Sequence, residues 1–155
     1  MIGFYLWNIS ARKPDDQYAS VGIGCSENIA EFISEKIINN SCIYISGEVG
    51  TGKTYLSKFI ANYFDINDLN SASYTKVSSF KGTLNIIHCD FYNIKPNQNF
   101  IETEILPNLI APWILIVEWP HMFYEIECNQ LIHIKLEAIG DYSRKISLTC
   151  FKQLL

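Results

Sequence analysis

Apolar residues recur with helical spacing in two segments of the chain and form short unbroken runs in two others. Within 26–38 and again within 53–64 they return every three or four positions, which predicts two amphipathic helices. The runs at 42–46 and 113–117 are rich in β-branched and aromatic residues, which is typical of strands buried on both faces. The pattern therefore predicts helices that alternate with buried strands.

The remaining segments extend this alternation. Further strands are predicted in 74–80 and 84–89, a short helix in 100–108, and a terminal hairpin from 131–137 and 145–151. Strands that alternate with helices favour an α/β fold with a largely parallel central sheet. We expect a single domain over 25–155. It is preceded by an N-terminal extension, 1–24, with one strand near 5–9 and a polar loop over 11–20.

A glycine-rich turn lies between the run at 42–46 and the helix at 53–64. It reads Gly47-Glu48-Val49-Gly50-Thr51-Gly52-Lys53-Thr54 and matches GxxxxGK[ST] in full. Such a loop turns backbone N–H groups toward polyphosphate oxygens, at the positive end of the following helix. The lysine of the motif reaches the β- and γ-phosphates, and the threonine hydroxyl binds Mg²⁺. The motif predicts a three-layer fold of the P-loop NTPase type.

Two acidic residues follow predicted strands. Glu118 follows the run at 113–117, and Asp90 follows the strand at 84–89. Either carboxylate could bind Mg²⁺ directly, bind it through water, or position an attacking water. An isolated acid after a strand is more often only a strand end, but beside a phosphate loop both are candidates for catalysis together with Lys53. His88 is expected to be a packed histidine.

Composition limits the partners and the compartment. The chain has 155 residues, 48% of them hydrophobic, which suits one packed domain. A formal net charge of −4 argues against a basic surface for nucleic acid. The longest apolar stretch, 105–117, is shorter than the ~20 residues that span a bilayer, so no membrane contact is expected. The five cysteines include no CxxC pair, which fits a reducing cytoplasm.

Other phosphate-loop classes fit the sequence less well. The Asn-Lys-x-Asp and Asp-x-x-Gly strings of GTPases do not occur. Small-molecule kinases clamp the transferred phosphate with several arginines, in a lid and an acceptor site. The arginines here are Arg12 and Arg144, and neither lies in the middle of the chain, where a lid would be inserted. A kinase is disfavoured but stays open, because lysines can substitute.

Several motifs together resemble those of the bacterial TsaE (YjeE) ATPases of tRNA threonylcarbamoyladenosine biosynthesis. After the phosphate loop come Ser71-Ala72-Ser73-Tyr74, His88-Cys89-Asp90-Phe91-Tyr92-Asn93 and Glu118-Trp119-Pro120. The family has Ser-Pro-Thr-Phe/Tyr, His-x-Asp-x-Tyr-Arg and Glu-Trp-Pro at these places. Order and spacing agree over 26–120.

This resemblance implies roles for individual residues. Thr54, Glu118 and Asp90 would contact or lie near Mg²⁺, with Asp90 needed for hydrolysis. Trp119 matches a tryptophan that the family keeps near its site. The residues implied to bind ATP are Glu27, Glu48, Val49, Gly50, Thr51, Gly52, Lys53, Thr54, Ser73 and Arg144.

By the same resemblance, the chain would hydrolyse ATP slowly when alone and serve a TsaB–TsaD complex that modifies tRNA. Contact with tRNA would be indirect, which fits the acidic charge. The chain departs from the family at Ala72, Ser73 and Asn93, which replace proline, threonine and arginine. These departures leave a further possibility, a degenerate nucleotide-binding module without turnover.

Overall fold

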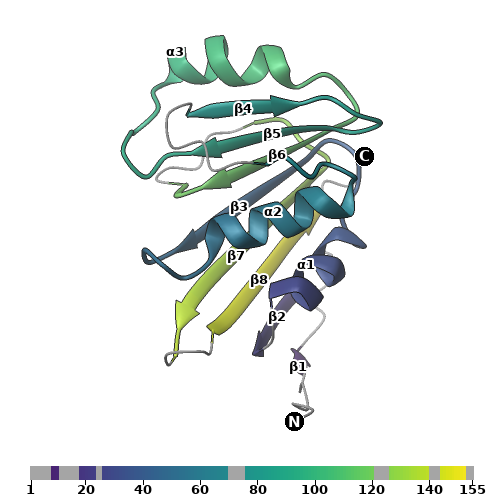
Figure 1. Ribbon diagram of the computed structural model, residues 1–155, viewed down its shortest axis with the longest axis vertical. Coiled ribbons are helices and arrows are strands. Elements are labelled where there is room, and N and C mark those ends of the chain that lie inside the picture. Colours follow the sequence, from purple (N-terminus) through teal and green to yellow (C-terminus); the bar gives the residue numbers. More distant parts are fainter. Residues whose placement is uncertain are drawn as a thin grey trace.

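The computed structural model describes residues 8–10, 18–23, 26–69, 76–120, 126–139 and 144–152. Their strands form one eight-stranded sheet in the order β1-β2-β8-β7-β3-β6-β5-β4 (Figure 1). The strands are β1 (Asn8–Ser10), β2 (Tyr18–Ile23), β3 (Ser41–Gly47), β4 (Val77–Phe80), β5 (Asn85–Asp90), β6 (Trp113–Glu118), β7 (Gln130–Ala138) and β8 (Arg144–Lys152). The helices are α1 (Ser26–Ser34), α2 (Lys53–Tyr63) and α3 (Gln98–Phe100), which continues as the π-helical turn η1 (Ile101–Ile105) and the 3-10 turn η2 (Leu106–Asn108).

The central strands β7, β3, β6 and β5 run parallel to one another. Antiparallel strands flank them, with β4 beside β5 on one side and β8, β2 and β1 beyond β7 on the other. The predicted α/β fold with a parallel centre and a terminal hairpin is confirmed. Because the central strands are parallel, their carboxyl ends meet at one edge of the sheet, where Asp90 of β5 lies in register with Glu118 of β6.

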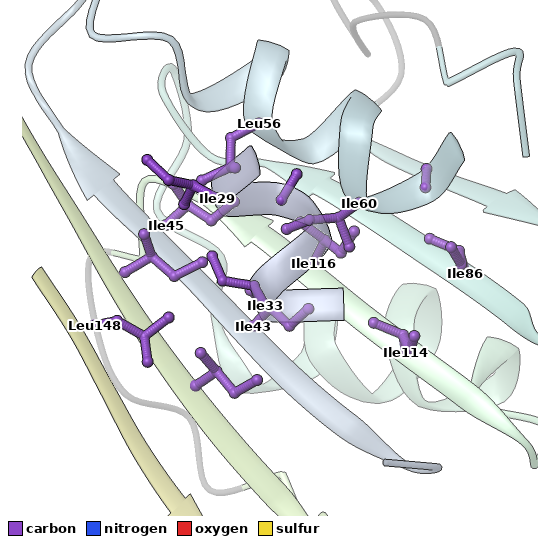
Figure 2. Packing of buried hydrophobic residues seen from close by; sticks show 14 of the residues in the cluster. Ile29, Ile33, Ile43, Ile45, Leu56, Ile60, Ile86, Ile114, Ile116 and Leu148 are labelled. Carbon is purple, nitrogen blue, oxygen red and sulfur yellow. The ribbon is translucent and has the colours of Figure 1, made fainter. Parts of the chain in front are cut away.

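Helical segments cover both faces of the sheet and make three layers. On one face, α1 and α2 pack through buried residues that include Ile29, Leu56 and Ile60 (Figure 2). On the other face, Ile101 and Ile105 of η1 belong to a second buried cluster. Each fully buried side chain of this size contributes about 1.5–3 kcal/mol relative to an exposed one, so the two clusters hold the layers together.

The period of two along a strand decides which side chains face α2. On β6, Ile116 belongs to the cluster beneath α1 and α2, so Glu118, two positions later, lies on the same face. On β5, Ile86 belongs to that cluster as well, and His88 and Asp90 follow at the same spacing. The apolar face beneath α2 therefore ends in polar residues at the carboxyl edge of the sheet.

The N-terminal segment differs from the prediction. Residues 18–20 belong to β2 and not to a loop, because β8 offers them backbone hydrogen-bonding groups; Tyr18 pairs with Cys150. The described strand β1 overlaps the strand expected over 5–9. The division of the chain at residue 24 stays a prediction.

The remaining boundaries shift by a few residues. Helix α1 ends at Ser34, before the end of the predicted span 26–38. The helix predicted in 100–108 is a continuous run of α, π and 3-10 turns that begins at Gln98. The start of the strand predicted over 74–80 and the hairpin turn at Gly140 and Asp141 lie outside the described residues. No helix in the described stretches is long and apolar enough to cross a membrane.

Candidate functional site

The phosphate-loop motif connects the carboxyl end of β3 to the start of α2. Gly47 has a φ of 148°, and a Cβ built on it would collide with the Leu136 carbonyl oxygen and lie 2.9 Å from Thr51 Oγ1. Gly52, the residue before α2, has a φ of 98°. Both backbone conformations are ones that residues with a Cβ rarely adopt. Gly52 also has no side chain to cap α2, which leaves the N–H groups of the first turn for a ligand.

Lys53 is the first residue of α2 and is only 5% exposed. Its Nζ donates to the carbonyl oxygens of Gly47 and Glu48, each at 2.8 Å, and lies 3.7 Å from the centroid of the Trp119 ring. Burial lowers the pKa of Lys53, while the nearby carboxylates of Glu118, Asp90 and Glu48 oppose that shift. The ammonium is thus held at the loop by acceptors on several sides.

Glu118 ends β6 and is 1% exposed. Its Oε2 accepts a hydrogen bond of 2.7 Å from Thr54 Oγ1. Its Oε1 accepts from Ser57 Oγ at 2.9 Å and lies 2.8 Å from His88 Nε2. Burial alone would raise the pKa of Glu118, but its hydrogen bond and electrostatic interaction with His88, with the hydroxyls of Thr54 and Ser57, hold it below its ordinary value.

Asp90 ends β5 beside Glu118 and is half-buried. Its Oδ1 accepts a hydrogen bond of 3.0 Å from the Tyr92 backbone N–H. Both carboxylates line an open cleft of about 330 Å³. The residues around the cleft are Val49, Gly50, Gly52, Lys53, Thr54, Tyr55, Asp90, Tyr92, Glu118 and Trp119.

The donor set in this cleft suits Mg²⁺ bound together with phosphate. Thr54, Glu118 and Asp90 offer only oxygen, the ligand atom that Mg²⁺ prefers. Across the described stretches, no group of three or more His, Cys, Asp or Glu residues could hold a metal ion. Magnesium takes octahedral coordination and usually keeps phosphate oxygens and water besides one or two carboxylates, which fits these three side chains.

Trp119 follows β6 with a backbone φ of 58°, a left-handed conformation that costs a non-glycine residue roughly 1–2 kcal/mol. Its N–H donates to the Ile45 carbonyl oxygen at 3.1 Å. Its ring lies 4.9 Å from the Tyr92 ring, centroid to centroid, at an angle of 48°. With this backbone the indole lies against Lys53 and also packs against the second buried cluster.

Three predicted residues remain, and the structure treats each differently. Arg144, the first residue of β8, places Nη2 at 3.5 Å from the Gly50 carbonyl oxygen, so the hairpin reaches the phosphate loop. Glu27 lies in the first turn of α1, and its role stays a prediction. Ser73 lies outside the described residues.

Sequence reasoning gave no role to Ser57 or His88. Both are fully buried, and both hydrogen-bond Glu118. Two signals could have found them: the period of two on β5 places His88 on the face of Asp90, and a spacing of three on α2 places Ser57 beside Thr54.

Comparisons with known proteins agree on one family. The family model described as "Threonylcarbamoyl adenosine biosynthesis protein TsaE" matches residues 24–146. The protein named tRNA threonylcarbamoyladenosine biosynthesis protein TsaE from Rickettsia bellii is 23% identical over 127 residues, covering 80% of this chain and 88% of the relative. Its namesake from Bacillus subtilis is 25% identical over 107 residues, covering 68% and 66%. The crystal structure of Bacillus subtilis YdiB matches 97% of this chain and 88% of its own, with a TM-score of 0.60 and 19% identity, and so shares the fold.

Proposed function

Because this chain belongs to the TsaE family of threonylcarbamoyl adenosine biosynthesis proteins, we propose that it is an ATPase that supports formation of threonylcarbamoyladenosine in tRNA. The observation that carries the proposal is the contact between Thr54 and Glu118, at 2.7 Å. It joins the hydroxyl of the phosphate loop to a carboxylate at the end of a neighbouring strand. This is the pair of oxygens that P-loop ATPases use for magnesium.

The phosphate loop and four side chains of the cleft have parts in the proposed reaction. The loop N–H groups and the start of α2 bind the phosphates of ATP, and the Lys53 ammonium neutralises their charge. Thr54 and Glu118 would hold Mg²⁺, which when bound neutralises charge that develops on the phosphate oxygens. Asp90 orients the attacking water and accepts its proton. The products are ADP and inorganic phosphate.

We further propose that the biological partner is a protein complex of the TsaB–TsaD type, and that this chain meets tRNA only indirectly. The formal net charge of −4 supports this proposal, since proteins that grip nucleic acid themselves carry a basic surface. A cytoplasmic location goes with a partner of this kind and stays a prediction.

ATP turnover with and without the TsaB–TsaD complex tests the proposal. We expect turnover in the wild type to rise with the partner and to be lost in Lys53→Ala. Lys58→Ala, a half-buried lysine of the same helix, is the matched control and should keep wild-type turnover. Equal turnover in the wild type and Lys53→Ala would overturn the proposal.

Labelled ATP separates the two alternatives from hydrolysis. Transfer of the label to an added nucleoside or sugar, in place of release to water, would identify a kinase. Tight ATP binding with no turnover, even with the partner complex present, would identify a degenerate module of the kind that Ala72 and Asn93 suggest.

A further inference from the structure

The two oxygens of the Glu118 carboxylate have different surroundings. Oε1 is held by Ser57 Oγ at 2.9 Å and His88 Nε2 at 2.8 Å, both from buried side chains. Oε2 is bonded to Thr54 Oγ1, which lines the open cleft. We propose that Ser57 and His88 are positioning residues that lock Oε1 and thereby present Oε2 to a magnesium ion. The inference rests on the proposed Mg-ATP chemistry.

Ser57 reaches Glu118 from the helix. Its Oγ lies 3.1 Å from the Lys53 carbonyl oxygen and 2.9 Å from Glu118 Oε1. A hydroxyl has one hydrogen to donate. An ionised carboxylate is the stronger acceptor, and its distance is the shorter, so the hydrogen goes to Glu118. Ser57 therefore links α2, which carries the phosphate loop, to the end of β6.

His88 reaches the same oxygen from the neighbouring strand. A carboxylate only accepts hydrogen bonds, so His88 Nε2 carries the hydrogen of this contact. The other ring nitrogen, Nδ1, is buried and has no hydrogen-bond partner in the part of the chain that the structure describes. The contact with Glu118 is then the only hydrogen bond available to this ring within that part of the chain.

The surroundings of His88 make a role in packing alone a poor explanation. Its in-register neighbour on β6 is Ile116, and the preceding residue on its own face is Ile86, both in the apolar cluster. A buried polar group without full hydrogen bonding is unfavourable in such a place. An isoleucine would fill this position at lower cost, so the histidine is explained by its bond to Glu118.

Together the two donors remove the rotational freedom of the carboxylate. With Oε1 fixed from α2 on one side and from β5 on the other, the group cannot exchange its oxygens by turning. Oε2 then stays beside Thr54, the second oxygen proposed to hold magnesium. Loss of either donor should weaken binding of the metal and leave the contacts of the phosphate loop with ATP in place.

Calorimetric titration with ATP, in the presence and absence of Mg²⁺, tests the inference. In the wild type, Mg²⁺ should raise the affinity. We call the ratio of ATP affinity with Mg²⁺ to that without it the magnesium gain. In Ser57→Ala and His88→Leu this gain should fall by about tenfold, as expected for a lost hydrogen bond to a charged group. The affinity for ATP without metal should be unchanged. In turnover assays the magnesium concentration needed for half-maximal rate should rise by a similar factor. His88→Gln keeps an N–H donor and should restore much of the gain.

Matched controls separate this role from a structural one. Ser34→Ala removes a buried hydroxyl from α1, and His133→Gln changes a histidine on β7; both should keep the magnesium gain. An unchanged gain in Ser57→Ala and His88→Leu, with only a lower melting temperature, would overturn the inference alone. A wild type that binds no Mg-ATP would overturn it together with the proposed function. If His88→Leu does not fold, the magnesium gain of Ser57→Ala still tests the inference.

Discussion

The ammonium of Lys53 lies 3.7 Å from the centroid of the Trp119 ring. The same nitrogen donates to the Gly47 and Glu48 carbonyl oxygens, so it has partners both within its own loop and across the cleft. Trp119 reaches this place only through a left-handed backbone, with φ at 58°. The indole is therefore held in position at a cost to the backbone.

Alanine is usually the more stable replacement and glycine the less stable one. We expect the backbone conformation of Trp119 to reverse this order of stability. Both Trp119→Gly and Trp119→Ala lose the ring, but alanine keeps the unfavourable left-handed φ and glycine does not. Trp119→Gly should therefore have the higher free energy of unfolding, by about 1 kcal/mol, as measured by urea denaturation. At Tyr92, whose backbone is outside this region, the alanine variant should be the more stable one. The same order at both positions would contradict the prediction.

Gln130 should contribute strongly to stability although it lies far from the cleft. It is 1% exposed; its Oε1 accepts from Ile38 N and Ser41 Oγ, and its Nε2 donates to the Lys36 carbonyl oxygen. Gln130→Leu removes the partner of the Ile38 N–H and of the Lys36 carbonyl, both part-buried, and should lower the free energy of unfolding by about 2–3 kcal/mol. Gln98→Leu, at an exposed glutamine, should change it by less than about 0.5 kcal/mol. Similar losses in the two variants would refute this account.

Gly47→Ala should damage both stability and ligand binding. The added Cβ would collide with the Leu136 carbonyl oxygen and lie 2.9 Å from Thr51 Oγ1. We expect the free energy of unfolding to fall by at least about 2 kcal/mol and ATP affinity to fall with it, by calorimetry. Gly82→Ala is the control, because its Cβ would meet Leu84 at an ordinary 3.5 Å. Equal stability of the two variants would contradict this prediction.

Cys128 should be reactive near neutral pH. The hydrogen bond from Cys42 lowers the pKa of Cys128 from 9.0 to about 7, and the thiol is half-buried. The thiolate is the nucleophile, so alkylation by iodoacetamide should quicken as pH rises through 7 and level off above it. The assay uses a Cys25→Ser background, because Cys25 lies outside the described residues. Cys128→Ser should abolish the fast reaction, and Cys42→Ala should move its midpoint upward. A midpoint near 9 with Cys42 present would refute the shift.

The sequence was sufficient to predict the elements that build the phosphate loop. Helix α2 and the buried strands β3 and β6 carry strong local patterns, and Asp90 and Glu118 follow their strands directly. Local spacing places Ser57 beside Thr54 and His88 on the face of Asp90, but their shared contact with Glu118 could not be predicted from it, because that contact exists only once α2, β5 and β6 pack together.

The error in the N-terminal segment has a similar cause. Residues 18–20 end the mostly polar segment 11–20, which contains Pro14, and this composition favours a loop. They form part of β2 because β8, more than a hundred positions later in the chain, supplies the hydrogen bonds of the strand pair. Pairing between distant segments leaves little trace in a local pattern.

The apolar core beneath α2 continues directly into the residues of the candidate site. On the α2 face of β6, Ile114 and Ile116 are followed directly by Glu118, and on β5 Ile86 is followed by His88 and Asp90 at the same spacing. The packing of these isoleucines therefore fixes the strand ends that carry the two carboxylates. Natural variation among these apolar residues would therefore shift the carboxylates, and with them the proposed turnover rate, without altering any group that lines the cleft.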